Sequence, residues 1–314
     1  MRRPAVRDAT RTARAFAPGH VTGFFDPSLE APDPRGRGST GGGLVLGAGA
    51  TAEATWTPEG PSRVTVRSPA ARRLPISEEV ARRLAAPCGG RVEVRIVHEL
   101  PIGQGFGASA SGALATGLAV ARATGQPTSR AVEVAHLAEL FGGGGLGGVA
   151  AILGGGVELR VRPGIPPFGR ILHRLVRGSV FVGIVGRPIA SPDVLGDPRT
   201  LERIRSAAAE IPRGTHAPTL TGLMDDAERF TDRLALGGAR LNAEIQRLRG
   251  PGVRVAQAMF GRSFFAVAST PAARRSFLRT LERRGLRALE LPLARRGAFA
   301  EQSLLSRGRV GANP

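Results

Sequence analysis

One glycine-rich segment constrains the fold of this chain more than any other part of it, Pro101-Ile102-Gly103-Gln104-Gly105-Phe106-Gly107-Ala108-Ser109-Ala110-Ser111-Gly112. Before it, residues 91–98 alternate between apolar and polar side chains, which predicts a strand with one buried face. After it, apolar residues recur at helical spacing over residues 109–123. A strand, a turn of glycines and a helix N-terminus can surround an anion, because glycine allows close approach and the helix offers unpaired N–H groups. The order predicts a phosphate-binding loop, with a simple strand-to-helix turn as the alternative.

The loop differs from two well-known phosphate-binding motifs. No Gly-Lys-Ser or Gly-Lys-Thr follows its glycines, so it is not a Walker A loop, and its spacing fits the Rossmann fingerprint poorly. Ser109 stands where the helix is expected to begin, and its hydroxyl could reach a metal ion that is bound to a phosphate.

Strands and helices are expected in mixed order along the chain, which favours an α+β fold over strict strand–helix alternation. At roughly 100–200 residues per domain, a length of 314 residues suggests two domains. The Pro- and Gly-rich segment 163–167 is the best candidate for a linker. We therefore expect one domain over residues 1–165 and a second over residues 166–314.

Local patterns predict the remaining elements. Thr128 is expected to cap a helix over residues 129–140, and the glycines of residues 38–43 are expected to form a mobile loop. Glu158 and Arg160 are expected on one side of a strand. The other predicted helices span residues 199–210, 220–236, 239–248 and 271–284, and the predicted strands span residues 51–56, 63–67, 157–162, 179–185, 253–259, 263–268 and 287–292.

The chain is strongly basic, with a formal net charge of +19, and all 44 of its basic residues are arginine. A nucleic-acid-binding protein is expected to cluster such charge and to interleave it with aromatic side chains. Here arginine is spread over the whole chain and aromatic residues make up only 4%. The abundance of Arg, Gly, Ala and Pro, all encoded by GC-rich codons, favours a composition bias, with RNA binding kept as an alternative.

Cysteine content and hydropathy indicate a cytoplasmic protein. A single cysteine, Cys88, excludes an intrachain disulfide framework and a cysteine-rich zinc site, and it fits a reducing compartment. No apolar region follows the basic start, so we expect no signal peptide. The uncharged stretches 100–121 and 140–157 are interrupted by glycine or polar residues, so we expect no membrane span.

The full loop pattern resembles the phosphate loop of the GHMP kinases: Pro, three residues, Gly, an apolar residue, Gly, one residue and Ser. Further segments resemble archaeal pantoate kinases within that superfamily: Ala17-Pro18-Gly19-His20-Val21-Thr22-Gly23-Phe24-Phe25, Gly38-Ser39 with its glycines, Ala135-His136-Leu137-Ala138-Glu139, Gly145-Leu146-Gly147 and Gly154-Gly155. The resemblance covers residues 13–165 and continues more loosely at 258–261. It implies an N-terminal domain like ribosomal protein S5 domain 2 and a ferredoxin-like C-terminal domain.

The resemblance also implies an activity. Such enzymes are ATP-dependent small-molecule kinases that convert pantoate to 4-phosphopantoate in archaeal coenzyme A biosynthesis, with ATP and Mg²⁺ as cofactors. The expected partners are pantoate and ATP, and neither a membrane nor a nucleic acid is expected. The oligomeric state stays open, with a homodimer among the alternatives.

Site residues carry over from the resemblance by position. Ser109 and Glu139 would hold Mg²⁺, which prefers hard oxygen ligands. The nucleotide would lie on Pro101, Gly103, Gly105, Phe106, Gly107, Ala108, Ser109, Ala110 and Ser111. Arg160 and His136 would bind pantoate, since a guanidinium can pair with a carboxylate through two hydrogen bonds, and His20, Thr22 and Ser39 would line the substrate end. The alternatives are a solvated Glu139, a packed His136, a surface Arg160 and a structural His20.

One departure from the family concerns the catalytic carboxylate. Where the family has Thr-Gly-Leu-Gly-Asp-Val, this chain has Gly144-Gly145-Leu146-Gly147-Gly148-Val149, so Gly148 replaces the expected catalytic Asp. Ile152 also replaces an expected Gln. Three hypotheses follow: phosphoryl transfer without a dedicated base, as is proposed for homoserine kinases; action on a different alcohol; or nucleotide binding without turnover. The first is physically reasonable because positioning and charge stabilisation dominate phosphoryl transfer.

Overall fold

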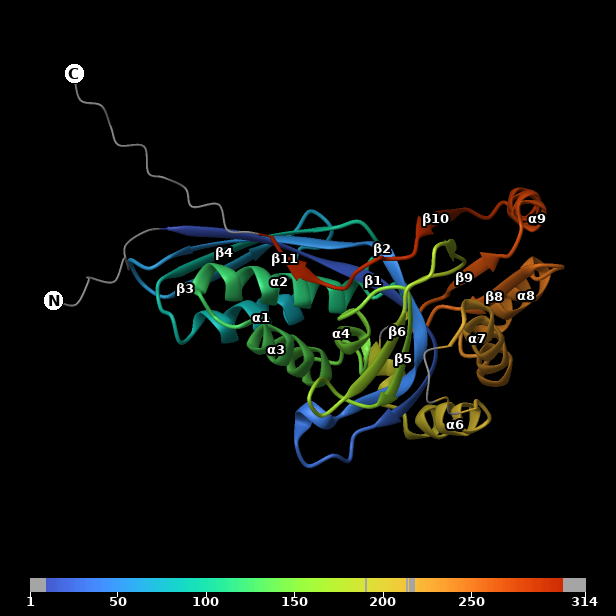
Figure 1. Ribbon diagram of the computed structural model, residues 1–314, viewed down its shortest axis with the longest axis horizontal. Coiled ribbons are helices and arrows are strands. Elements are labelled where there is room, and N and C mark those ends of the chain that lie inside the picture. Colours follow the sequence, from blue (N-terminus) through green and yellow to red (C-terminus); the bar gives the residue numbers. More distant parts are fainter. Residues whose placement is uncertain (1–9, 190, 213, 215–217, 302–314) are drawn as a thin grey trace, which may run out of the picture.

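The structure is a computed structural model that describes residues 10–189, 191–212, 214 and 218–301 (Figure 1). It contains a seven-stranded sheet and a four-stranded sheet, each with helices packed against it. This arrangement confirms the predicted α+β fold. None of the helices in the described residues is both long enough and apolar enough to cross a lipid bilayer.

A long antiparallel hairpin forms the centre of the first sheet. β1 (Arg11–Ser28) pairs with β2 (Gly38–Thr57) along almost its whole length. The C-terminal half of β2 pairs with β4 (Arg91–His98), and its N-terminal part pairs with β5 (Val157–Arg162). The sheet is completed by β3 (Arg63–Arg67) beside β4, β6 (Arg170–Arg174) beside β5 and β11 (Phe299–Ala300) beside β1.

Two helices, α1 (Pro75–Ala85) and α2 (Ala108–Thr124), pack against one face of this sheet, and α3 (Thr128–Phe141) packs against these two helices (Figure 1). Every second residue of the central strands faces these helices and is alanine, as at Ala13, Ala15, Ala17, Ala50, Ala52 and Ala54, all of them buried. Small side chains let α2 pack closely against the hairpin, and α2 is buried over nearly its whole length. The N-terminus of α2 is thereby fixed relative to β1.

The second sheet has the strand order β10 (Ala288–Pro292), β7 (Ser179–Ile184), β9 (Ser263–Ala268) and β8 (Val253–Gln257), all antiparallel. Numbered along the chain, this is the order 4-1-3-2 of the ferredoxin-like fold, in which one strand lies between the two strands of a βαβ unit. The helices that accompany it are α5 (Ser191–Leu195), α6 (Pro198–Ala209), α7 (Leu220–Leu234), α8 (Gly238–Leu248) and α9 (Pro271–Arg283).

One hydrophobic cluster joins the two sheets. It contains Val21 and Leu44 from the first sheet together with Val180 and Phe265 from the second. Met259, next to the second sheet, donates its backbone N–H to the carbonyl of Thr22 on β1 at 3.3 Å. The loop 258–261 is therefore held against the first sheet, close to the glycine-rich loop.

The structure corrects parts of the sequence interpretation. Residues 38–43, expected to be a mobile loop, form the start of β2, where glycines let β1 approach: a Cβ on Gly41 would lie 2.3 Å from the Phe24 carbonyl oxygen. Helix α1 was not predicted. Thr128 is the first residue of α3, and the N-cap is Pro127. β6 and β11 come from beyond residue 165 yet pair with the first sheet, and the domain boundary near that residue stays a prediction.

Candidate active site

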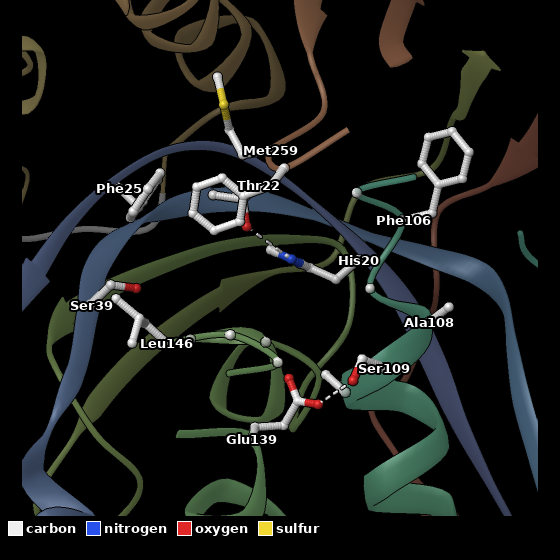
Figure 2. A pocket seen from close by; sticks show the side chains of 18 of the residues that line it. His20, Thr22, Phe25, Ser39, Phe106, Ala108, Ser109, Glu139, Leu146 and Met259 are labelled. Atoms are coloured by element: carbon white, nitrogen blue, oxygen red, sulfur yellow. Dashed lines mark hydrogen bonds between the residues drawn. The ribbon is translucent and has the colours of Figure 1, made fainter. Parts of the chain in front are cut away.

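A cavity of about 120 Å³ lies where β1, β2, β5, the N-terminus of α2 and the end of α3 meet (Figure 2). Its lining contains most of the predicted site residues: His20, Thr22, Ser39, Gly103, Gly105, Phe106, Gly107, Ala108, Ser109, Ala110, Glu139, Gly148 and Arg160. The rest of the lining consists of apolar side chains and glycines, namely Phe25, Leu146, Ile189, Met259, Phe260, Gly144, Gly145 and Gly147.

The glycine-rich loop has the backbone conformation that its glycines allow. Gly103, Gly105 and Gly107 have φ angles of 78°, 75° and 70°, in the left-handed region that side chains disfavour. A Cβ on Gly107 would lie 2.7 Å from the backbone nitrogen of His20. Gly107 is also the N-cap of α2, and no side chain caps that end within the described residues. The first N–H groups of α2 are therefore left for an anion in the cavity.

Contacts from both sheets hold this loop in place. The hydroxyl of Ser263 on β9 donates to the carbonyl of Gln104 at 2.5 Å, and the Gln104 amide donates to the carbonyl of Gly186 at 3.1 Å. The His20 N–H donates to the carbonyl of Phe106 at 3.1 Å, and the Phe106 ring is buried in the cluster that joins the sheets. No local pattern distinguishes Gln104 within the loop, because its partners lie 82 and 159 positions away along the chain.

Ser109 and Glu139 point toward each other at the start of α2 (Figure 2). The Ser109 hydroxyl donates to Oε1 of Glu139 at 2.5 Å, and Glu139 is only 4% exposed. Burial raises the pKa of Glu139 from 4.5 to about 7, and the hydrogen bond from Ser109 opposes this shift. The carboxyl group thus titrates near neutral pH in the unliganded protein.

The oxygens of Ser109 and Glu139 suit a magnesium ion, because both are hard ligands that face the cavity. No group of three or more His, Cys, Asp and Glu side chains that could hold a metal occurs in the described part of the chain. Mg²⁺ often takes only one or two ligands from the protein and the others from water and phosphate oxygens. The pair therefore fits a metal that arrives with a nucleotide.

Arg160 lies on β5 and is buried, with 2% of its surface exposed. Its Nη1 donates to Oε1 of Glu158, while its Nε has no hydrogen-bond partner within the described residues. A Cβ on Gly147 would lie 2.7 Å from that Nε and 2.7 Å from the Ser39 hydroxyl. The guanidinium and Ser39 thus flank Gly147 of the glycine run at the cavity.

His20 lies between Glu158, the carboxylate that Arg160 contacts, and the hydroxyl of Thr22. The His20 Nε2 lies 2.9 Å from Oε1 of Glu158, and its Nδ1 lies 3.4 Å from the Thr22 hydroxyl. Burial lowers the pKa of His20, against the opposing effect of Glu158. Burial raises the pKa of Glu158, but Arg160 and His20 outweigh it, and the net pKa is lowered. A neutral His20 therefore donates from Nε2 to a charged Glu158 and accepts at Nδ1 from Thr22.

Three of the residues expected in the site lie outside this cavity. The His136 side chain is buried and its Nε2 lies 3.4 Å from the carbonyl of Pro34, so it packs against the loop before β2. The Ser111 hydroxyl is buried and donates to the carbonyl of Ala108 at 3.1 Å. Pro101 is exposed at the start of the loop. Their predicted binding roles stay predictions.

Gly148 borders the cavity as the first residue of α4 (Gly148–Ala151). It is not among the glycines with positive φ, so its backbone conformation is open to other residues. Among the described residues, a Cβ there would meet only the Cβ of Ala110, at 2.8 Å. Gly144 differs, because a Cβ on it would lie 2.5 Å from Oε1 of Glu139. The buried carboxylate thus occupies the space that a side chain at residue 144 would need.

Parts of this chain are similar in sequence to known proteins. Residues 75–156 match the family described as GHMP kinases N terminal domain. The pantoate kinase of Thermococcus kodakarensis is 40% identical over 162 residues, which cover 50% of this chain and 54% of that protein. The chain thus spans about half the length of that relative. The pantoate kinase of Methanospirillum hungatei is 27% identical over 262 residues, 81% of this chain and 86% of that protein.

Solved structures show the same fold. A "Phosphotransferase related to CoA biosynthesis pathway" superposes with a TM-score of 0.77 at 28% identity, covering 95% of this chain and 100% of that one. A homoserine kinase from Cytophaga hutchinsonii superposes with a TM-score of 0.59 at 14% identity, over 96% of this chain and 100% of that one. The likeness includes both sheets.

Proposed function

We propose that this chain, which has a GHMP kinase N-terminal domain within the GHMP kinase fold, is an ATP-dependent kinase that phosphorylates the 4-hydroxyl of pantoate. One observation carries the proposal: the Ser109–Glu139 oxygen pair at the uncapped N-terminus of α2 lines the same cavity as a buried Arg160. The first group suits a metal–phosphate, and the second suits a small carboxylic acid. The sequence identity to two pantoate kinases, 40% and 27%, supports pantoate as this acid.

At the donor end, the N–H groups of α2 and the glycine-rich loop would bind the phosphates of ATP. Ser109 and Glu139 would hold the magnesium ion that accompanies it. A magnesium ion supplies positive charge that neutralises the charge on the phosphoryl group during transfer. Because the loop is fixed by Ser263 and Gln104, the donor phosphate would be held without rearrangement of the loop.

At the acceptor end, the unpartnered Nε of Arg160 would donate to the carboxylate of pantoate. Ser39 and Thr22 place hydroxyl groups on the same cavity and would bind the acceptor's hydroxyl groups. The side chain of Arg160 would then set the distance between the acceptor and the donor.

Gly148 makes proton removal the open step of this reaction. Of the described residues that line the cavity, the titratable ones are His20, Glu139 and Arg160, and no carboxylate stands at residue 148. We propose that transfer proceeds by positioning and charge stabilisation, which dominate phosphoryl transfer. Because Gly148 replaces the expected catalytic Asp, nucleotide binding without turnover is the second candidate function.

The test is ADP formation by the purified protein with ATP, Mg²⁺ and pantoate, homoserine or mevalonate in turn. We expect turnover with pantoate. Ser109→Ala should reduce it by about 10–100-fold, the size typical for a lost group at a metal site. Ser129→Ala, on the exposed first turn of α3, serves as the matched control and should leave the rate unchanged. Tight ATP binding without turnover on any alcohol would favour the second candidate function, and equal rates in Ser109→Ala and wild type would contradict the loop assignment.

A further inference from the structure

We propose that Glu158 is a positioning residue of the acceptor site, and that its single carboxylate orients both the Arg160 guanidinium and the His20 imidazole. The inference rests on the proposed function, because it assigns the acceptor to this side of the cavity. Glu158 itself does not line the cavity, so it acts through the two side chains that do.

The sheet brings the three side chains together across three strands. Glu158 on β5 pairs in register with Gly43 on β2, and His20 on β1 lies on the far side of β2. A Cβ on Gly43 would lie 2.4 Å from the His20 Nε2. The missing side chain at Gly43 therefore makes room for the imidazole to cross β2 and reach Oε1 of Glu158 at 2.9 Å.

Glu158 also determines which edge of the guanidinium faces the acceptor. Glu158 is fully buried and accepts a hydrogen bond from Nη1 of Arg160, while glycines border the rest of the guanidinium. A Cβ on Gly41 would lie 3.0 Å from Nη2, and one on Gly147 would lie 2.7 Å from Nε. Because Nη1 is bound to Glu158, the edge with Nε is left for a carboxylate.

The same carboxylate sets the hydrogen-bond direction at Thr22. The charged and titratable groups around His20 are Glu158 and Arg160 on β5 and His173 on β6. Because His20 donates from Nε2 to Glu158, its Nδ1 must accept, and the Thr22 hydroxyl donates to it. The oxygen of Thr22 then presents only lone pairs to the cavity. It can accept a hydrogen bond from a hydroxyl group of the acceptor.

Kinetics of Glu158→Gln test this assignment. We expect the KM for pantoate to rise by about 10-fold or more, the size typical for losing a side chain that orients a binding group, with the KM for ATP unchanged. In an Arg160→Gln background, Glu158→Gln should add no further increase, because the two residues act together. A lowered KM for pantoate, or equal changes for both substrates, would overturn the proposal. Glu93→Gln, on the exposed face of β4, is the control for a lost glutamate charge.

Histidine NMR tests the orientation without a need for catalysis. The ¹⁵N shifts of wild-type His20, assigned by comparison with His20→Gln, should show a neutral ring protonated at Nε2. In Glu158→Gln, we expect a mixture of tautomers. A wild-type ring protonated at Nδ1 would overturn the proposal even if pantoate were phosphorylated. A fixed Nε2 tautomer in a protein that does not phosphorylate pantoate would retain the role of Glu158 and refute only the proposed substrate.

Discussion

Restoring a carboxylate at residue 148 tests how the site manages proton removal. Gly148 has an ordinary backbone conformation, so the change to Asp meets one obstacle, the Cβ of Ala110 at 2.8 Å. Ordinary contact begins at 3.4 Å, so the new side chain or Ala110 must give way by 3.4 − 2.8 = 0.6 Å.

The expected rate follows from two opposing effects. A well-placed general base accelerates a reaction by about 10²–10⁴-fold. A displacement of 1 Å can cost about 10²-fold, so a shift of 0.6 Å removes a large part of that gain. We expect Gly148→Asp to accelerate a slow wild type by about 10–100-fold. Adding Ala110→Gly removes the obstructing methyl and should raise the rate further, although glycine within α2 costs about 1 kcal/mol of stability.

The assay is pre-steady-state ADP formation with saturating ATP and pantoate. Gly148→Asn serves as the control, because it has the shape of Asp without its basicity. A slow wild type that Asp accelerates and Asn does not would show that the site lacks only its base. A slow wild type unaffected by Asp, even with Ala110→Gly and with the fold intact, would refute the reasoning. A fast wild type with no gain would instead support transfer without a base.

Two further predictions concern charged groups at the cavity. Arg160→Lys keeps the charge but loses the planar donor edge, so we expect a raised KM for pantoate and an unchanged KM for ATP in steady-state kinetics; an equal effect on both would indicate a folding role. For Glu139, whose pKa is raised to about 7, binding of Mg-ATP measured by calorimetry should weaken as the pH falls from 8 to 6, because the metal must displace the proton. The same raised pKa means that the native state retains a proton that the unfolded chain releases, so the free energy of unfolding of the unliganded protein should fall as the pH rises from 4.5 to 7. Glu139→Gln should remove both dependences, and a wild type with the same Mg-ATP affinity at both pH values would contradict the assignment.

Local patterns were sufficient for much of the fold. The alternation in residues 91–98 predicted β4 with the bounds that the structure has, and the glycines after it predicted a loop that ends at α2. The hairpin of β1 and β2 was harder to predict, because half of β2 is Ala or Gly and β1 carries Ala at the positions that face the helices, and neither residue is typical of strands. Its regularity, alanine at every second residue, becomes meaningful only once the two strands are paired.

In the site, too, some residues could be predicted from the sequence, and others depend on contacts between distant parts of the chain. The resemblance to the GHMP kinases predicted Ser109, Glu139 and Arg160 as site residues, and the structure brings all three to one cavity. Glu158 was placed on the correct side of its strand, but its contact with His20 joins residues 138 positions apart. No local pattern contains such a contact. For His136, helical spacing alone could not show that the ring faces the carbonyl of Pro34 rather than the cavity.

The short strand β11 affects how this chain can fold during synthesis. Phe299 and Ala300 pair with Phe16 and Ala15 at the edge of the first sheet, and the rings of Phe16 and Phe299 lie 5.8 Å apart. Domains generally fold from the N-terminus as they leave the ribosome. This sheet, although built mostly from early residues, lacks its edge strand until residue 300 has emerged. The exposed edge of β1 would be a transient site for pairing with other nascent chains throughout translation of the second sheet.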